Sequence, residues 1–163
     1  MLINSFGLQA NAKNYISINS LDDLSKIENL YDKKLLILGS GTNVILDNYF
    51  DGTVIKVQLT DIENHKDYIS VGGGVDWAQL IEYCLENGLY GIENLTHIPG
   101  SVGAAPVQNI GAYGVEISSF IKNIECFNLK TKQLETLNND QCKFGYRNSI
   151  FTSKDLVILK VNF

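Results

Sequence analysis

The sequence predicts a fold of mixed strands and short helices. Short runs rich in Val, Ile, Leu, Phe and Tyr are separated by turns with Gly, Asn and Asp, a pattern typical of β-strands. One longer segment carries apolar residues at the spacing of an amphipathic α-helix. A chain of 163 residues with 45% hydrophobic side chains is long enough for one core, or for two small subdomains packed together.

The first part of the chain predicts a helix followed by strands. Residues 20–30 carry Leu or Ile at every third position, which predicts a short amphipathic helix. Residues 35–38 form an apolar run that predicts a strand before a Gly-rich turn. The runs VIL at 44–46 and TVIKV at 53–57 predict a short strand and a longer one.

The middle of the chain predicts a strand and then a helix. Residues 67–71 have strand composition and lead into three glycines at 72–74. Residues 76–87 predict a helix that Gly88 closes at its C-terminal end. Its apolar residues share one face and predict docking on a core: Trp77, Leu80, Ile81, Cys84 and Leu85.

The last part of the chain predicts a β-hairpin and a final strand. Residues 120–129 and 132–137 flank a short Lys-Thr-Lys turn, and the first of these runs alternates apolar and polar positions. Residues 138–151 are rich in turn formers. Residues 156–163, LVILKVNF, predict the final strand.

Charge and hydropathy restrict the classes of partner. A net charge of −5 at pH 7 argues against a nucleic-acid partner, which calls for a basic face. No run approaches the roughly 18 consecutive apolar residues that span a bilayer, so we expect no membrane partner. The N-terminus lacks the basic flank and apolar run of a signal peptide, and we therefore expect a cytoplasmic protein.

Cysteine and histidine residues give no metal-site signal. Cys84, Cys126 and Cys142 are odd in number and widely spaced, which suggests neither a disulfide framework nor a CxxC site. We expect reduced thiols, with Cys84 in core packing. His65 and His97 stand apart from the second histidine or carboxylate that a metal site needs.

Three glycine-rich stretches are the main functional signal: GSGTNV at 39–44, GGGV at 72–75 and IPGSVGAAPVQNIGAYG at 98–114. Glycine lets the backbone come close to a ligand while offering N–H donors. The second stretch precedes a predicted helix start, where free N–H groups favour an anion. Each stretch by itself is also typical of a tight turn. Together they predict a nucleotide or dinucleotide whose pyrophosphate is bound by main-chain N–H groups.

Two common phosphate-binding motifs are absent from the sequence. The Rossmann fingerprint G-x-G-x-x-G opens a helix, whereas GSGTNV has Val44 at the third glycine position and continues into a strand-like run. No Gly-Lys-Ser/Thr of a Walker A loop occurs. The sequence therefore leaves the identity of the nucleotide open.

Arg147 is the only arginine among 13 basic residues. A composition rich in Lys, Asn and Ile explains the scarcity of arginine as codon bias. Under that bias a retained arginine points to a role that lysine cannot fill, because only the guanidinium offers a planar fork of five donors.

Longer motifs resemble one family, the UDP-N-acetylenolpyruvoylglucosamine reductases (MurB), which are flavoenzymes of bacterial cell-wall precursor synthesis. The resemblance runs from NSFG through LILGSGTNVIL and VGGGVDW to GIENLTHIPGSVGAAPVQNIGAYGVE and CKFGYRNSIF. The last two strings are the specific ones, because short glycine patterns recur by chance.

The resemblance implies an α+β FAD-binding module of the vanillyl-alcohol oxidase and p-cresol methylhydroxylase type. It implies two subdomains, residues 1–56 and 57–163, that hold FAD chiefly through main-chain groups around the pyrophosphate. The residues that it places at the cofactor are Gly39, Gly41, Thr42, Asn43, Val44, Gly100, Ser101, Gly103, Ala104, Val107, Gln108, Ile110 and Gly111.

The resemblance also implies a reaction in two halves. NADPH reduces FAD, and the reduced flavin delivers hydride to the enolpyruvyl double bond of UDP-N-acetylglucosamine enolpyruvate. Arg147 matches the catalytic arginine, which stabilises negative charge that develops at the substrate carboxylate. Tyr113 and Tyr146 are weaker candidates for substrate contacts and are also typical of structural tyrosines.

Members of this family are longer and carry a C-terminal substrate-binding domain, with a proton-donating serine and a glutamate, that these 163 residues lack. We therefore expect an FAD-binding portion that binds FAD but does not turn over without the C-terminal domain. Two alternatives stay open: another flavin oxidase or dehydrogenase of the same superfamily, and a non-catalytic flavin-binding module.

Overall fold

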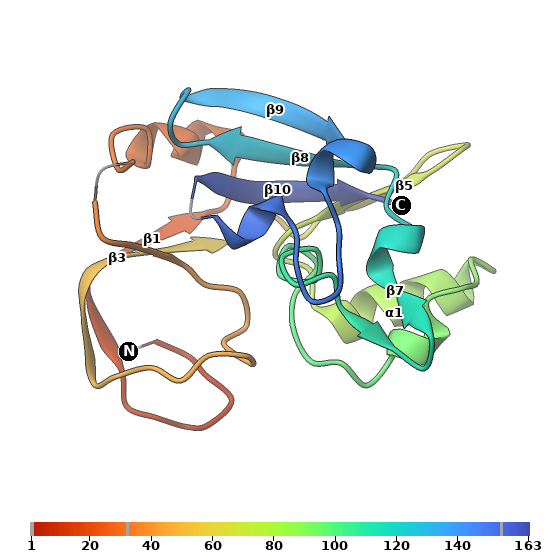
Figure 1. Ribbon diagram of the computed structural model, residues 1–163, viewed down its shortest axis with the longest axis horizontal. Helices are drawn as coiled ribbons and strands as arrows, with labels where there is room; N and C mark the ends of the chain where they lie inside the picture. The colour runs from red at the N-terminus through yellow and green to blue at the C-terminus, as the bar shows by residue number, and fades with distance from the viewer. Residues whose placement is uncertain (1, 32, 154) are drawn as a thin grey trace.

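The computed structural model describes residues 2–31, 33–153 and 155–163 and has an α+β fold (Figure 1), which confirms the predicted class. The strands are β1 (Asn11–Ile18), β2 (Leu35–Ile37), β3 (Tyr49–Val57), β4 (Ile62–Asn64), β5 (Ile69–Gly72), β6 (Gly111–Ala112), β7 (Val115–Glu116), β8 (Asn123–Asn128), β9 (Gln133–Asn138) and β10 (Leu156–Asn162). The helices are α1 (Trp77–Glu86) and the short 3-10 helices η1 (Leu21–Lys26), η2 (Glu93–Leu95), η3 (Ile117–Ser119), η4 (Asp140–Cys142) and η5 (Ile150–Thr152).

Two sheets form the framework. A parallel sheet has the strand order β1-β3-β2, and an antiparallel sheet has the order β4-β5-β10-β8-β9. The short strands β6 and β7 pair with each other as a separate hairpin. The three-stranded sheet comes from the first part of the chain and the five-stranded sheet from the rest. The subdomain boundary after Lys56, one residue before the end of β3, stays a prediction.

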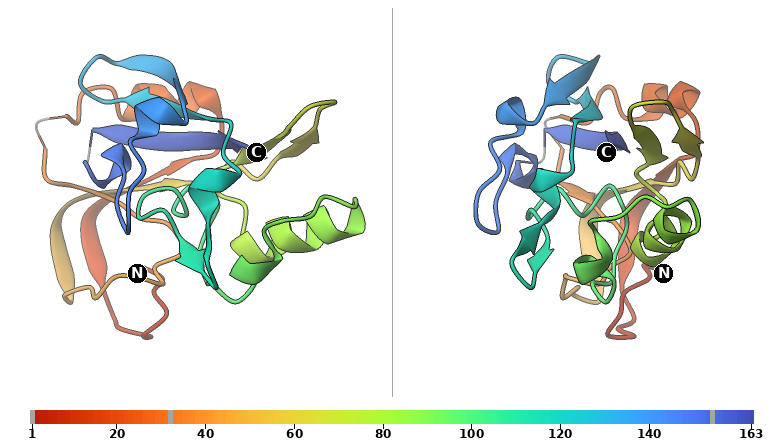
Figure 2. Two further views of the ribbon diagram at one scale, coloured as in Figure 1. Left: turned by 45° about the vertical axis from the view of Figure 1, so that its right-hand side comes forward. Right: turned by 90° about the vertical axis from the view of Figure 1, so that its right-hand side faces the viewer.

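The strand β10 contributes to two separate cores because its successive side chains point to opposite faces, and an irregularity in its pairing with β8 between Ile158 and Lys160 shifts the alternation beyond it. Val157 and Leu159 pack in one core with Ile55 of β3. Ile158 and Val161 pack in the other core, with α1. In Figure 1 and the left view of Figure 2, α1 and the three-stranded sheet lie at opposite ends of the molecule, and each lies next to the five-stranded sheet.

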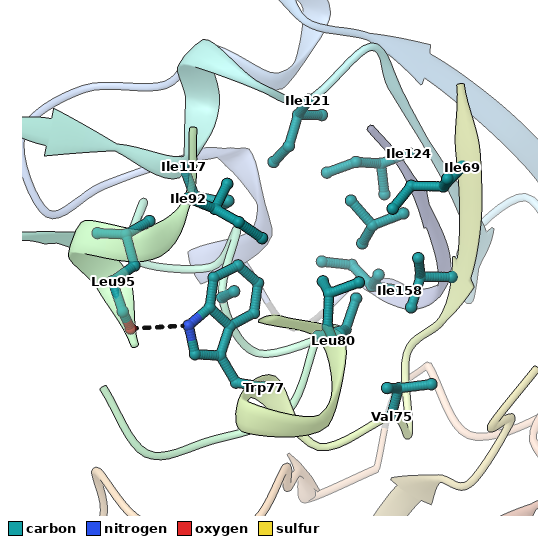
Figure 3. Packing of buried hydrophobic residues seen from close by; sticks show 14 of the residues in the cluster. Ile69, Val75, Trp77, Leu80, Ile92, Leu95, Ile117, Ile121, Ile124 and Ile158 are labelled. Carbon is teal, nitrogen blue, oxygen red and sulfur yellow. Dashed lines mark hydrogen bonds between the residues drawn. The ribbon is translucent and has the colours of Figure 1, made fainter. Parts of the chain in front are cut away.

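The helix α1 docks through a buried aromatic residue. Asp76 caps its N-terminus by accepting the N–H of Ala78 at 2.9 Å, and Gly88, with a left-handed φ of 68°, follows its C-terminal end. Trp77 is 1% exposed, and its indole Nε1 donates to the main-chain oxygen of Leu95 at 3.0 Å (Figure 3). Burial of a side chain of this size stabilises the fold by about 3 kcal/mol, and the hydrogen bond satisfies its polar atom.

Most predicted elements are confirmed. The helix predicted at residues 76–87 is α1, and the predicted hairpin is the pair β8 and β9. The strands predicted at 35–38, 53–57, 67–71 and 156–163 are β2, β3, β5 and β10.

The helix predicted over residues 20–30 is wrong in kind and in length. The chain forms only the 3-10 helix η1 there. Leu and Ile at every third position fit the 3.0 residues per turn of a 3-10 helix better than the 3.6 of an α-helix. Leu24 and Ile27 are buried, whereas Leu21, three residues before Leu24, is 53% exposed.

Further differences concern single side chains and strands, among them the short strands β4, β6 and β7, which were not predicted. The short strand predicted at residues 44–46 does not form, because these residues pair with no other described strand, although Val44 and Leu46 pack against a small core and Ile45 is 84% exposed. Leu85, predicted on the buried face of α1, is 46% exposed. The strand β1 was not predicted, since its polar, half-exposed sequence NAKNYISI acquires strand character only by pairing with β3.

Candidate functional site

A cavity of about 550 Å³ lies where the loop after β2 meets the long loop before β6. Its lining residues are Ile37, Leu38, Gly39, Ser40, Gly41, Thr42, Asn43, Val44, Trp77, Ile98, Pro99, Gly100, Ser101, Ala104, Ala105, Val107, Gln108, Ile110 and Arg147. A second cavity of about 220 Å³ adjoins it and shares six of these residues, Ile37, Leu38, Gly39, Ser101, Ala104 and Val107. We call residues 39–44 the first wall and residues 98–110 the second wall.

The first wall contains main-chain donors that have no partner in the protein. Within the described part of the chain, the N–H groups of residues 39–44 donate to no acceptor. Gly41 has φ 70°, and a side chain there would collide with the main-chain oxygen of Ile3. A Cβ on Gly39 would lie 2.9 Å from Oγ of Ser101 in the second wall. Glycine at position 39 thus lets the two walls approach each other, and glycine at position 41 lets the first wall lie against the N-terminal segment.

The second wall adds donors of the same kind. The N–H groups of Gly100, Ser101 and Gln108 also have no acceptor among the described residues. The main-chain oxygen of Gly100 accepts the N–H of Trp77 at 3.0 Å, which fixes this wall to the start of α1. Gly100 has φ 153°, a backbone conformation that residues with a side chain rarely adopt.

Side chains connect the two walls across the cavity. Oγ1 of Thr42 donates to the main-chain oxygen of Pro99 at 3.1 Å. Nδ2 of Asn43 donates to Oε1 of Gln108 at 3.0 Å. These bonds join segments 57 and 65 residues apart in the sequence, so the site exists only in the folded chain.

Arg147 is the one charged side chain among the described residues that line the cavity. It lies in a turn closed by reciprocal main-chain bonds of 3.0 and 3.1 Å between Gly145 and Asn148. Its Nη2 donates to the main-chain oxygen of Gly111 at 3.1 Å, and its guanidinium lies 5.8 Å from the ring centre of Tyr146. An anion in the cavity therefore meets N–H dipoles and one cation, with no carboxylate in the lining.

The glycine stretch at residues 72–75 offers no free donor to the site, although Gly73 lines the adjoining cavity. Its N–H groups already donate to main-chain oxygens: Gly72 to Asp61, Gly73 to Leu159, Gly74 to Leu59 and Val75 to Gly72. The prediction of free N–H groups at this helix start is therefore wrong. These glycines instead allow close packing, because a Cβ on Gly74 would lie 2.7 Å from Cα of Gln58.

The structure brings most of the predicted cofactor residues together. All of them except Gly103 and Gly111 line the 550 Å³ cavity. Gly103 lines the adjoining cavity, and Gly111 accepts the hydrogen bond from Arg147. Tyr113 and Tyr146, the weaker substrate candidates, are 86% and 85% exposed and lie outside the lining. The contacts of all these residues with FAD, NADPH or substrate stay predictions.

The predicted cofactor residues did not include seven residues of the lining: Ile37, Leu38, Ser40, Trp77, Ile98, Pro99 and Ala105. All of them except Trp77 lie within the first or third glycine stretch or directly precede the first, so position in the sequence was an available signal. Such apolar surface beside convergent donors is typical of cofactor sites.

The cysteines are free, buried and outside the cavity lining. Desolvation by burial raises the pKa of the Cys126 thiol to about 12 and that of Cys142 to about 11. Burial also raises the pKa of Cys84, which packs in the core. These thiols stay protonated at neutral pH and are poor nucleophiles.

The described residues contain no cluster of three or more His, Cys, Asp or Glu side chains placed to hold a metal ion. Within the same ranges, no helix has the length and apolar character needed to cross a membrane.

The chain is similar to a family of FAD-binding domains and to curated reductases. Residues 14–136 match the family described as FAD binding domain. A UDP-N-acetylenolpyruvoylglucosamine reductase of Pseudoalteromonas translucida is 43% identical over 153 residues, which cover 91% of this chain and 45% of that protein. The reductase of the same name from Amoebophilus asiaticus is 41% identical over 170 residues, with 98% and 50% coverage.

A crystal structure supports the fold. The UDP-N-acetylenolpyruvylglucosamine reductase (MurB) of Thermus caldophilus matches with a TM-score of 0.75 at 24% identity, over 90% of this chain and 53% of that one. The resemblance drawn from the sequence motifs is confirmed by the reductases of Pseudoalteromonas translucida and Amoebophilus asiaticus. The chain spans about half the length of the curated relatives that it matches.

Proposed function

Because this chain belongs to the FAD binding domain family, we propose that it binds FAD between the first and second walls of the cavity. The observation that carries the proposal is the set of bare N–H groups at residues 39–44 and at Gly100, Ser101 and Gln108. A pyrophosphate accepts such donors in place of water, and no carboxylate in the lining repels it.

The rest of the cavity fits the remaining parts of a dinucleotide. Ile37, Leu38, Ile98 and Ile110 offer apolar surface to flat rings, and the adjoining cavity of about 220 Å³ extends the space beyond the pyrophosphate. Glycine at position 39 keeps a side chain away from Ser101 and Ala104, which line both cavities. We place the pyrophosphate at the two walls and the rings against the apolar residues.

We further propose that the chain is the flavin-binding portion of an NADPH-dependent oxidoreductase of peptidoglycan precursor synthesis. By analogy with the reductases that it resembles, the substrate is UDP-N-acetylglucosamine enolpyruvate and the product is UDP-N-acetylmuramate. A C-terminal substrate-binding domain completes the enzyme, and the cytoplasm is the compartment of the reaction.

The role of Arg147 follows from its place at the cavity. When bound, FAD supplies the hydride chemistry. The guanidinium at the edge of an otherwise uncharged lining offers a cation to the carboxylate of an enolpyruvyl group, whose negative charge grows during reduction. A fixed cation stabilises that later charge more than the starting charge, which is the condition for accelerating the reaction.

FAD binding is tested with the purified chain. Trp77 is the only tryptophan and lines the cavity, so its fluorescence reports binding directly. We expect FAD to quench it in a saturable way, and FMN and riboflavin, which lack the pyrophosphate and adenosine, to bind at least about tenfold more weakly. A chain that binds none of the three, or all equally, contradicts the proposal.

The reaction is tested after the chain is joined to a C-terminal domain from one of its relatives. We expect NADPH oxidation that requires UDP-N-acetylglucosamine enolpyruvate. Oxygen consumption that does not require this substrate would instead indicate a flavin oxidase. FAD binding without any NADPH oxidation would indicate a non-catalytic flavin-binding module.

A further inference from the structure

Asn109 lies in the second wall and is buried although it is polar. It is 1% exposed, and its φ of 44° lies in the left-handed region, where asparagine is one of the few residues with a side chain that occurs regularly. A buried amide destabilises a fold unless it is hydrogen-bonded. Its bonding partners therefore show what this residue holds in place.

The side chain of Asn109 bonds to two separate parts of the chain. Its Oδ1 accepts the N–H of Ser118 at 3.1 Å, and its Nδ2 donates to Oε2 of Glu116 at 2.9 Å. The same Nδ2 donates to the main-chain oxygen of Gly145 at 3.2 Å. Glu116 and Ser118 follow Asn109 closely, whereas Gly145 is 36 residues away and begins the turn that carries Arg147.

Two further hydrogen bonds connect this turn and the residue after it to the same loop. Oγ of Ser149 donates to the main-chain oxygen of Val107 at 2.8 Å. Nη2 of Arg147 donates to the main-chain oxygen of Gly111 at 3.1 Å. The contacts thus fall at alternate positions of the loop, 107, 109 and 111, and Asn109 provides the middle one.

The turn needs these external bonds because its own conformation is unfavourable. Arg147 has φ 53°, a left-handed backbone that is costly for a residue with a Cβ. Tyr146 and Arg147 are both exposed, so neither packs into a core. The direction in which the guanidinium leaves the turn is therefore set by the bonds to the loop.

We propose that Asn109 is a positioning residue that holds Arg147 at the edge of the cavity. Asn109 fixes the main-chain oxygen of Gly145, and with it the turn of Arg147, to the second wall. It also lies two residues before Gly111, whose main-chain oxygen accepts the hydrogen bond from Arg147. The inference rests on the proposed function only for the role of the Arg147 charge toward the substrate. The geometry that it asserts can be measured without any flavin.

The sequence provides a clean probe, because Arg147 is the only arginine. Protein labelled with ¹⁵N-arginine gives side-chain NMR signals from this residue alone. In the wild-type protein we expect a side-chain shift distinct from that of free arginine and slow exchange of the Nη protons with water. Asn109→Gly suits the left-handed backbone and removes only the amide. We expect it to move the signal to the free-arginine position and to speed exchange about fivefold, as the loss of one hydrogen bond implies.

Asn139→Ala is the matched control. Nδ2 of Asn139 donates to the main-chain oxygens of Ser118 and Ile121 at 2.7 and 2.8 Å. The variant therefore loses a comparable amide at η3, to which Asn109 also bonds through Ser118, but it loses no bond to the Arg147 turn. We expect it to lower the unfolding midpoint in urea while leaving the arginine signals unchanged. If both variants move the arginine signals, Asn109 has only a general structural role and the proposal is wrong.

The remaining outcomes also decide the question. Unchanged arginine signals in folded Asn109→Gly overturn the proposal. If that variant does not fold, Glu116→Ala keeps Asn109 but removes the carboxylate that aligns its amide. We then expect a smaller shift in the same direction, and no shift overturns the proposal. FAD titration of the same samples is separate, because a chain that fails to bind FAD still shows whether Asn109 positions Arg147.

Discussion

Nδ2 of Asn43 donates a hydrogen bond to Oε1 of Gln108 across 3.0 Å, and this bond closes one side of the cavity. The two residues belong to opposite walls, 65 residues apart in the sequence. The side-chain oxygen of Gln108 serves the fold, while its main-chain N–H has no acceptor among the described residues and is free for a ligand. A change of charge at this position therefore tests what the cavity binds.

We predict that Gln108→Glu keeps the bond from Asn43 but weakens FAD binding about tenfold, or about 1.4 kcal/mol, at neutral pH. The added carboxylate repels a pyrophosphate at the walls, and salt screens that repulsion. The loss should therefore shrink as the salt concentration rises. Fluorescence titration of Trp77 at low and high salt measures it.

Gln133→Glu is the control, because it adds the same charge at an exposed position of β9 far along the chain from the walls. We expect its FAD affinity to match that of the wild type at both salt concentrations. A Gln108→Glu protein that binds FAD as tightly as this control would mean that the phosphates lie elsewhere.

Gly41 gives a second test of the first wall. It has φ 70°, and a Cβ would collide with the main-chain oxygen of Ile3. Gly7 has nearly the same φ, 67°, with no atom within 4 Å of a Cβ. We predict that Gly7→Ala lowers the free energy of unfolding by about 1 kcal/mol from backbone strain. Gly41→Ala should lower it by more and should also weaken FAD binding at least about tenfold, because the wall itself must move.

Urea unfolding and Trp77 titration on both variants separate backbone strain from the collision. Equal losses of stability and of FAD affinity in the two variants would show that the contact of Gly41 with the N-terminal segment does not shape the wall.

The sequence was informative where a residue's role depends on its own neighbours. The helix α1 could be predicted from its apolar face and Gly88, and β10 from a continuous apolar run. Glycine stretches indicated close approach of the backbone, because glycine is needed there for steric reasons. These features are local, and the fold preserves them.

Roles that depend on distant partners could not be predicted. The glycines at residues 72–75 look like those of the first wall, but their N–H groups find acceptors in residues 59, 61, 72 and 159. Nothing in the sequence distinguished Asn109 from its neighbours Gln108 and Ile110, because its bond to Gly145 spans 36 residues. The same limit applies to β1, whose partner β3 lies far along the chain.

Because Arg147 has a left-handed backbone, we expect glycine to be more stabilising than alanine at this position, the reverse of the usual order. Glycine adopts φ 53° without strain, whereas alanine does not, although in most settings alanine is the more stabilising residue. We predict that Arg147→Gly is at least as stable as the wild type, and that Arg147→Ala is about 1 kcal/mol less stable than Arg147→Gly. Urea midpoints with unchanged slopes measure this difference.

Both variants remove the cation from the cavity edge, so they also separate stability from function. We expect FAD affinity to change less than about threefold in each, because the pyrophosphate is bound by main-chain donors. If Arg147→Ala is more stable than Arg147→Gly, the backbone of residue 147 is not strained and the prediction is wrong. Loss of FAD from both would show that the arginine serves the cofactor and not the substrate.

The buried thiol of Cys126 makes stability fall at alkaline pH. Burial raises its pKa from 9.0 to about 12, and the pKa of Cys142 rises in the same way to about 11. Because the folded-state pKa is the higher one, the folded protein keeps a proton that the unfolded chain releases above pH 9. The contribution to stability is thus complete below the unfolded pKa and is lost as the pH rises from 9 toward the folded value, by about 1.4 kcal/mol per pH unit for each thiol.

We predict that Cys126→Ala is less stable than the wild type at pH 8, because the variant leaves a small cavity in a fully buried site. Between about pH 9 and 11 the free energy of unfolding should fall less steeply in the variant than in the wild type. The two slopes should differ by about 1.4 kcal/mol per pH unit, because the variant lacks one titrating thiol. Urea unfolding at intervals of pH measures both effects, and the contributions of all groups that the two proteins share cancel in the comparison. Equal slopes for the two proteins would mean that the thiolate of Cys126 is tolerated in the folded state. Rapid reaction of the native protein with a thiol reagent at pH 8 would support that reading, because only an accessible thiolate reacts quickly.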